Sequence, residues 1–66
     1  MCLATVYLDE KSDDKVVLSD VAALYADGPR VVIQTLFGEA KSIEGYMIGE
    51  INLTDNFVIL RKETHV

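Results

Sequence analysis

Short apolar segments separated by residues that favour turns run along the whole chain, and this spacing constrains the fold most strongly. Runs rich in β-branched and aromatic residues are typical of strands, whereas Gly, Pro, Asn and Asp favour the connections between them. The segments that we expect to be extended are residues 3–8, 15–18, 21–26, 30–36, 47–54 and 57–61. About six short antiparallel strands at such spacing are typical of a small barrel or sandwich, so the sequence predicts an all-β fold.

The clearest alternation of apolar and polar residues lies in the segment 47–54. Its apolar set, which we expect on one face of a strand, is Met47, Gly49, Ile51 and Leu53. The segment 21–26 mixes helix-favouring with strand-favouring residues, but the turn signal at 27–29 joins it to the next strand as a hairpin. Residues 40–46 are the least determined, with Gly45 as the expected bend, and residues 55–56 are expected to form a tight turn.

The size of the chain points to a single domain, residues 1–66, that associates with a second copy. Half of the residues are hydrophobic, but a chain this short buries only roughly 60% of its unfolded surface. The single cysteine cannot close an internal disulfide, which is a common means of stabilising small domains. We therefore expect a homodimer.

The charge balance argues against nucleic acid as a partner. The chain has 11 acidic and 6 basic residues and a net charge of −5. Affinity for nucleic acid comes mostly from Lys and Arg neutralising phosphates, and Lys11, Lys15, Lys41, Arg61 and Lys62 are scattered. No basic cluster is present in the sequence.

The sequence also predicts a cytoplasmic protein without a membrane segment. No apolar run approaches the ~20 residues that a spanning helix needs, and acidity disfavours anionic membranes. The first residues lack a positive region and reach Asp9 and Glu10 early, unlike a signal peptide. A free thiol fits a reducing compartment.

The most suggestive chemical group is the thiol of Cys2, directly after Met1. A thiolate at this position lies within chelating reach of a free α-amino group and of its own backbone nitrogen. Sulfur and nitrogen donors suit Ni(II) and Cu(II) in square-planar geometry and Zn(II) in tetrahedral geometry. The alternative is that Cys2 is simply a small buried hydrophobic residue.

Three segments together resemble the CooT family, small nickel-binding accessory proteins associated with maturation of carbon monoxide dehydrogenase. The resemblance extends from Met1 to about Arg61 and includes Met1-Cys2-Leu3-Ala4, the element at 35–39 (Thr-Leu-Phe-Gly-Glu) and the element at 45–53. It implies a homodimeric Sm-like or SH3-like barrel that acts as a nickel metallochaperone. It further implies that Cys2 binds Ni(II) at the dimer interface, with the Met1 amine and the following amide completing the coordination.

Two other protein classes share features with this chain: RNA-binding modules of Sm-like shape and hydrogenase-maturation chaperones. Many CooT proteins have been catalogued as predicted RNA-binding proteins, so an RNA-binding module of Sm-like shape is the alternative function. The hydrogenase-maturation chaperones typified by HypC also begin with a similar Met-Cys-Leu-Ala, but a Pro-Gly pair follows there. This chain has Thr5-Val6-Tyr7 at that place, and its only proline is Pro29.

The remaining candidate residues favour structural roles. His65 lies in a polar tail and is assigned no ligand role, and the acidic pair Asp13-Asp14 is expected to serve solubility rather than bind a divalent ion. The aromatic side chains are expected to pack in a core or a dimer seam instead of stacking on bases: Tyr7, Tyr25, Phe37, Tyr46 and Phe57. With no catalytic constellation or phosphate-binding loop, we predict that the chain is not an enzyme.

Overall fold

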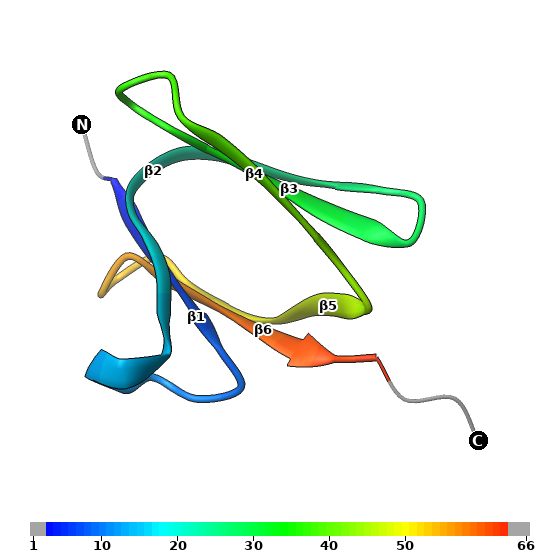
Figure 1. Cartoon of the computed structure of the whole chain (residues 1–66). Coiled ribbons are helices and arrows are strands. Elements are labelled where there is room, and N and C mark those ends of the chain that lie inside the picture. The colour runs from blue at the N-terminus through cyan, green and yellow to red at the C-terminus, as the bar shows by residue number, and fades with distance from the viewer. Residues whose placement is uncertain (1–2, 64–66) are drawn as a thin grey trace.

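The computed structural model describes residues 3–63, which form six strands and one 3-10 turn (Figure 1). The elements are β1 (Ala4–Leu8), η1 (Asp13–Lys15), β2 (Val16–Asp27), β3 (Arg30–Thr35), β4 (Ala40–Glu44), β5 (Tyr46–Asn52) and β6 (Phe57–Lys62). The prediction of an all-β fold is confirmed. Within residues 3–63, no helix is long and apolar enough to cross a membrane.

Several predicted segments have different bounds in the structure. The segments 15–18 and 21–26 belong to one long strand, β2, which continues through Asp20 with a positive φ of 57°. The undetermined segment 40–46 contains β4, the bend at Gly45 and the start of β5. The turn before β6 spans residues 53–56 and not only 55–56.

All six strands belong to one sheet in the order β4-β3-β2-β1-β6-β5. Every neighbouring pair is antiparallel except β1 and β6, which run parallel with Thr5 opposite Phe57 and Leu8 opposite Leu60. The expectation of antiparallel strands throughout was therefore wrong for this pair. Gly45 alone separates β4 from β5, and these two strands lie at opposite edges of the sheet. Because they do not form a hairpin, the alternation of strand directions is broken between them, and β6 runs parallel to β1.

Gly45 joins the two edge strands only at one end of the sheet. Its φ is +82°, its amide donates to the carbonyl of Pro29 (3.4 Å), and its carbonyl accepts from the amide of Glu63 (2.8 Å). The sheet curls so that β3 and β4 lie across from β5 and β6 (Figure 1), but β4 and β5 are not hydrogen-bonded to each other. The all-β sheet therefore curls as in the expected small barrel or sandwich but does not close into a barrel, because it stays open between its edges.

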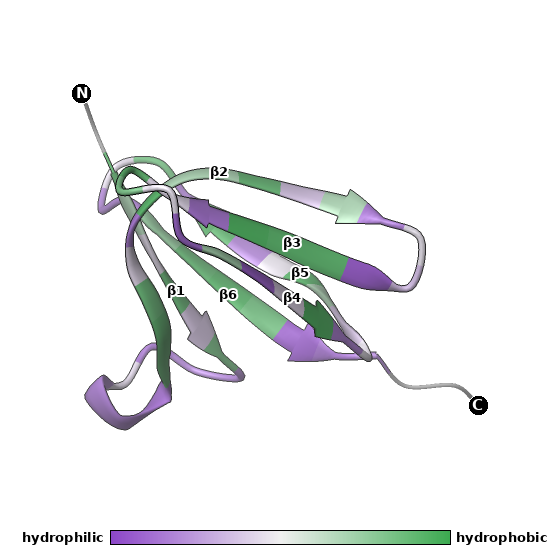
Figure 2. Cartoon of the chain, turned by 45° about the horizontal axis from the view of Figure 1, so that its top comes forward, coloured by the Kyte–Doolittle hydropathy of each residue, from purple (hydrophilic) through white to green (hydrophobic). Residues whose placement is uncertain are grey.

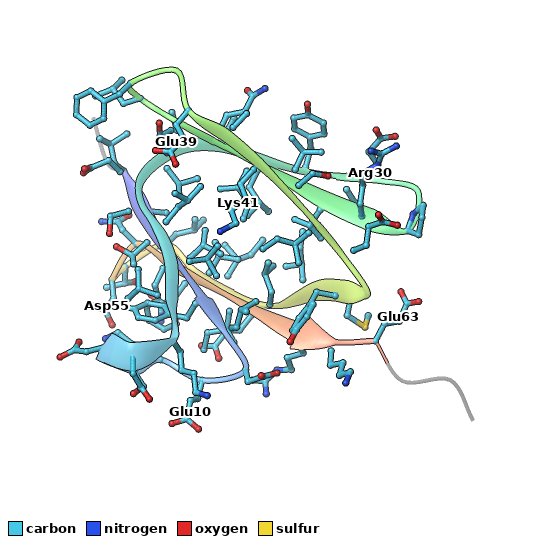
Figure 3. All side chains as sticks on the ribbon, in the orientation of Figure 1. Glu10, Arg30, Glu39, Lys41, Asp55 and Glu63 are labelled. Carbon is cyan, nitrogen blue, oxygen red and sulfur yellow. The ribbon has the colours of Figure 1, made fainter. Side chains whose placement is uncertain are left out.

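The charged side chain of Lys41 on β4 disfavours closure of the sheet between β4 and β5. It lies opposite Ile33, whose side chain is fully buried, so both side chains project from the same face of the sheet. The side chain of Lys41 therefore extends from β4 towards the inside of the curl while remaining exposed (Figure 3). An inward-pointing charge on an edge strand opposes pairing with another strand, and it would be costly to bury in a closed barrel.

The core lies on the concave face of the sheet. Its buried members are Val6, Val21, Val31, Ile33, Val58 and Leu60. On the opposite face of β6, Phe57 and Ile59 are buried as well. The ring of Tyr7 contacts Phe57 edge to face at 6.2 Å, and Lys11 Nζ lies 4.9 Å from the centroid of Phe57. Figure 2 shows the resulting pattern, with largely apolar strands β1, β3 and β6 and a polar connection before β2.

The apolar face predicted for the segment 47–54 is divided by a bulge in β5. The register with β6 shifts between Ile48 and Glu50. Before the shift, Tyr46 and Ile48 pack against the core while Met47 is half exposed, and after it Ile51 lies opposite the buried Val58. The expectation that Met47 and Ile51 share one face of the strand was therefore wrong, because the extra residue changes the alternation.

Candidate metal site at the start of the first strand

The two predicted metal ligands, Met1 and Cys2, lie outside the described residues, but the structure places the residues that follow them. Ala4 begins β1 and lies opposite Val21 of β2, which in turn lies opposite Thr35 at the end of β3. On the other side of β1, the Thr5 amide donates to the carbonyl of Asn56 (3.1 Å). The start of β1 is therefore flanked by β2 and β3 on one side and by the β5–β6 connection on the other.

Figure 1 shows the same arrangement at the scale of the whole chain. The start of β1, the β3–β4 connection and the β5–β6 connection lie at one end of the molecule, on the left of the view. The β2–β3 turn, the joint between β4 and β5 and the end of β6 lie at the other end. The described part of the chain therefore begins at the first of these ends.

Both connections at this end are held by short polar contacts. In the β3–β4 connection, the Glu39 amide donates to Thr35 Oγ1 (3.1 Å) and the Leu36 amide donates to the carbonyl of Asp20 (2.9 Å). In the β5–β6 connection, Asn52 Oδ1 accepts from the amides of Thr54 (3.0 Å) and Asp55 (2.8 Å). Thr35 and Asn52, which belong to the segments of the CooT resemblance, thus hold the backbone of the two connections beside the start of β1.

Large apolar side chains remain exposed in and beside these connections. Leu36 and Phe37 are 49% and 79% exposed, and Ile51 and Leu53 are 53% and 83% exposed. A shallow hollow of about 190 Å³ lies between β2 and β5, lined by residues that include Val21, Leu24, Ile51 and Val58. The sequence analysis missed Leu36 and Leu53 as surface residues, although their position beside turn residues was a signal.

Metal-binding groups elsewhere in the described chain are sparse. Residues 3–63 contain no group of three or more His, Cys, Asp or Glu side chains placed to hold a metal ion. Asp13 and Asp14 are exposed in the connection after β1, at the far end of that strand from Ala4. His65, to which the sequence assigned no ligand role, lies outside the described residues.

Asp14 already has a hydrogen-bond partner. The Ser12 hydroxyl donates to Asp14 Oδ1, and this bond is the main reason why the pKa of Asp14 lies below its usual value of 3.8. The hydrogen bond to its own backbone amide and the charge of Lys15 lower the pKa further. These local contacts agree with a structural role for the acidic pair.

In the part of the chain that the structure describes, two basic side chains lie beside acidic ones, and the aromatic residues are divided between packed and exposed positions. Arg30 and Arg61 each lie 4.0 Å from a carboxylate, those of Asp27 and Glu50. Of the aromatic residues, Tyr7 and Phe57 pack on each other, whereas Tyr25 and Phe37 are exposed at opposite ends of the molecule. The expectation of packing in a core or a dimer seam is confirmed as burial within the fold for Phe57. Phe37 is exposed in the single chain, so for it the dimer seam stays a prediction.

Comparison with known proteins agrees with this fold. The chain is similar to the crystal structure of a protein assigned as CooT from Carboxydothermus hydrogenoformans, with a TM-score of 0.80 and 22% sequence identity. The match covers 96% of this chain and 100% of that one. At this identity the likeness establishes the fold alone. No curated protein matches the chain.

The sequence itself matches a family model described as "CO dehydrogenase accessory protein CooT" over residues 1–61. The match includes the Met-Cys start, the β3–β4 connection and the strands β5 and β6. It confirms the resemblance on which the sequence analysis relied. The chain belongs to the CooT family of CO dehydrogenase accessory proteins.

Proposed function

We propose that the chain binds Ni(II) through Cys2 in a homodimer and assists the maturation of a nickel enzyme such as carbon monoxide dehydrogenase. The observation that carries the proposal is the match to an accessory family of that enzyme over residues 1–61, which includes Cys2. In this role the chain carries a metal and is not itself a catalyst. The reduced thiol that nickel binding requires favours the cytoplasm.

The donor chemistry supports nickel. Two Cys2 thiolates and two nitrogen donors, one pair from each copy, form an S2N2 set suited to square-planar Ni(II). The donors that the family resemblance implies come from the first two residues of each copy. Copper would compete strongly for such a set, so selectivity depends on geometry or on metal supply.

The state of Met1 determines the second donor. If Met1 is retained, its amine or the Cys2 amide supplies the nitrogen donor that each copy adds to the Cys2 thiolate. If Met1 is removed, the Cys2 amine and thiolate form a single five-membered ring. In both cases nickel that binds only the dimer stabilises the dimer by mass action.

Spectroscopy of the purified chain tests the nickel site. Addition of Ni(II) is expected to produce thiolate-to-nickel charge-transfer absorption, and Cys2→Ser is expected to abolish it, because only a thiolate gives this band. His65→Ala is the matched control and should retain the absorption. An unchanged spectrum and affinity in Cys2→Ser would exclude the site.

Native mass spectrometry with and without nickel completes the test. The proposal predicts a mass of two chains plus one nickel ion, and the same measurement reports whether Met1 is present. One nickel per single chain would contradict a site that two copies share.

A further inference from the structure

We propose that the free edge of β4 binds an extended segment of another protein as an additional strand, with an acidic side chain of that segment opposite Lys41. Strand addition of this kind takes its affinity from main-chain hydrogen bonds and its specificity from the side chains that meet across the two strands. The proposal concerns a protein partner and does not depend on the nickel site.

The backbone of β4 bonds to β3 through its odd-numbered residues. Just before β4, the amide of Thr35 donates to the carbonyl of Glu39 (2.8 Å), and just after it the amide of Gly45 donates to the carbonyl of Pro29 (3.4 Å). Between these two contacts the register of β3 and β4 continues without a shift. In an antiparallel pair, such hydrogen-bonded residues alternate with residues whose amide and carbonyl groups point the other way.

The even-numbered residues Ala40, Ser42 and Glu44 therefore present their amide and carbonyl groups at the free edge. All three are exposed, and no strand of the described chain pairs with β4 on this side. The other edge of the sheet, β5, is a poorer template. Its register with β6 shifts between Ile48 and Glu50, and a bulge interrupts the regular row of hydrogen-bonding groups that an added strand needs.

Lys41 and Ile43 are the side chains that an added strand would meet on the concave face of the sheet. They lie opposite the buried residues Ile33 and Val31 of β3. Ile43 packs against the core, whereas Lys41 stays exposed inside the curl (Figure 3). Opposite a new strand, both would stand in non-hydrogen-bonded pairs, in which the Cα atoms approach to about 4.5 Å and the side chains are closest.

The charge of Lys41 determines which strand fits. The ion pairs of the described residues are formed by Arg30 and Arg61, and neither includes Lys41. An apolar strand would desolvate this cation without pairing it, whereas an acidic residue opposite it forms a favourable cross-strand pair. The inward charge that opposes indiscriminate pairing thus selects a strand with the complementary charge.

The two inward positions together define the partner segment. Ile43 favours an apolar residue opposite it, and Lys41 favours an acidic one. In an antiparallel strand, which is the more stable arrangement per residue, the residue opposite Ile43 comes two positions before the residue opposite Lys41. The expected segment is therefore extended and carries an apolar residue, any residue and then an acidic residue.

The same charge disfavours a second copy of this chain at the edge. Two β4 strands related by a twofold axis run antiparallel to each other. Pairing centred on Lys41 places two like charges directly opposite, and pairing centred on Ser42 leaves them on one face about 7–8 Å apart. The net charge of −5 on each copy adds to this repulsion.

Two blocked peptides test the proposal on the full chain. Ser-Thr-Val-Thr-Glu-Thr-Ser has the apolar and acidic residues at the required spacing, and in the control peptide Lys replaces the Glu. An NMR titration of the isotope-labelled chain measures the two dissociation constants. The peptide with Glu should bind at least fivefold more tightly than the peptide with Lys.

Charge reversal on the protein provides the matched test. Lys41→Glu should reverse the preference, so that the peptide with Lys becomes the tighter ligand. Lys15→Glu makes the same change of charge on the exposed 3-10 turn, away from β4, and should keep the original preference. Both lysines are exposed, so the variants are expected to fold, which circular dichroism verifies.

Amide hydrogen exchange locates the bound peptide. Exchange should slow at Ala40, Ser42 and Glu44, whereas Lys41 and Ile43, which already bond to β3, should change little. Equal binding of the two peptides, binding of neither, or an unchanged preference in Lys41→Glu would overturn the proposal. Protection along β5 would do the same. Protection of Ser42 that rises with protein concentration in the absence of peptide would also overturn it, because a second copy would then occupy the edge.

Discussion

The amide of Thr5 in the first strand donates a hydrogen bond to the carbonyl of Asn56, just before the last strand, across 3.1 Å. This contact precedes the only parallel pairing among the described strands, in which Thr5 to Leu8 lie beside Phe57 to Leu60. It joins the start of β1 to the connection that carries Leu53. The position of the start of β1 relative to the β5–β6 connection therefore depends on contacts between segments from opposite ends of the sequence.

The backbone conformation of Asn56 gives the first prediction. Its φ of 57° lies in the left-handed region, which Asn and Gly tolerate and β-branched residues do not. Asn56→Val is expected to destabilise the fold by about 1–2 kcal/mol, whereas Asn56→Gly should have a much smaller effect. Urea unfolding of both variants measures the difference. Equal losses in the two variants would show that the side chain matters and the backbone conformation does not.

The second prediction concerns Leu60, which is fully buried in the core on β6. Leu60→Ala should lower the free energy of unfolding by about 2–5 kcal/mol through lost burial and a cavity. For 66 residues the total is only about 3–10 kcal/mol, so this variant is expected to lose a large share of its stability.

Two further variants test whether the loss of stability comes from the lost side-chain volume and from the buried position of Leu60. Leu60→Met keeps nearly the same volume and should cost below about 1.5 kcal/mol. Met47→Ala at a half-exposed position should cost below about 1 kcal/mol. Thermal unfolding followed by circular dichroism ranks the three variants. A cost at Met47 equal to that at Leu60 would contradict the assignment of the core.

The third prediction follows from the lowered pKa of Asp14. Its carboxyl group has a lower pKa in the folded chain than its usual 3.8, mainly because Ser12 donates a hydrogen bond to it. The resulting stabilisation is present above the unfolded pKa and is lost as pH falls through the folded pKa. Ser12→Ala should therefore raise the pKa of Asp14 towards 3.8. An NMR titration of the carboxyl carbon measures this shift, and no change would exclude the hydrogen bond as its cause.

The fourth prediction concerns the pH dependence of nickel binding under the proposed function. A thiol with an ordinary pKa of about 8.5 must lose its proton to bind the metal. Between pH 8 and pH 6 the apparent nickel affinity should fall about tenfold per pH unit for each thiolate bound. Titrations at three pH values measure the slope. Affinity that does not change with pH would argue against thiolate coordination by Cys2.

Much of the strand content was predictable because local signals determine it. The turn at 27–29 closes a hairpin in which Asp27 lies opposite Arg30, as the turn residues indicated. Residues 30–35 and 57–62 form strands because they are rich in β-branched and apolar residues. Residues 40–44 carried no clear alternation, and they form a strand because pairing with β3 overrides weak local preference.

The candidate site was likewise predictable from the sequence only in part. The sequence alone identified Cys2 as the candidate metal ligand and the family that the comparison then confirmed, because a thiol is a chemical feature of the residue type and needs no fold. Tertiary structure alone determined that Leu36 and Leu53 lie on either side of the first strand. That relationship depends on the parallel pairing of β1 with β6 and on the bend at Gly45. Pairing between residues more than 50 positions apart has no local signal, since it is decided by which strands bury each other's apolar faces.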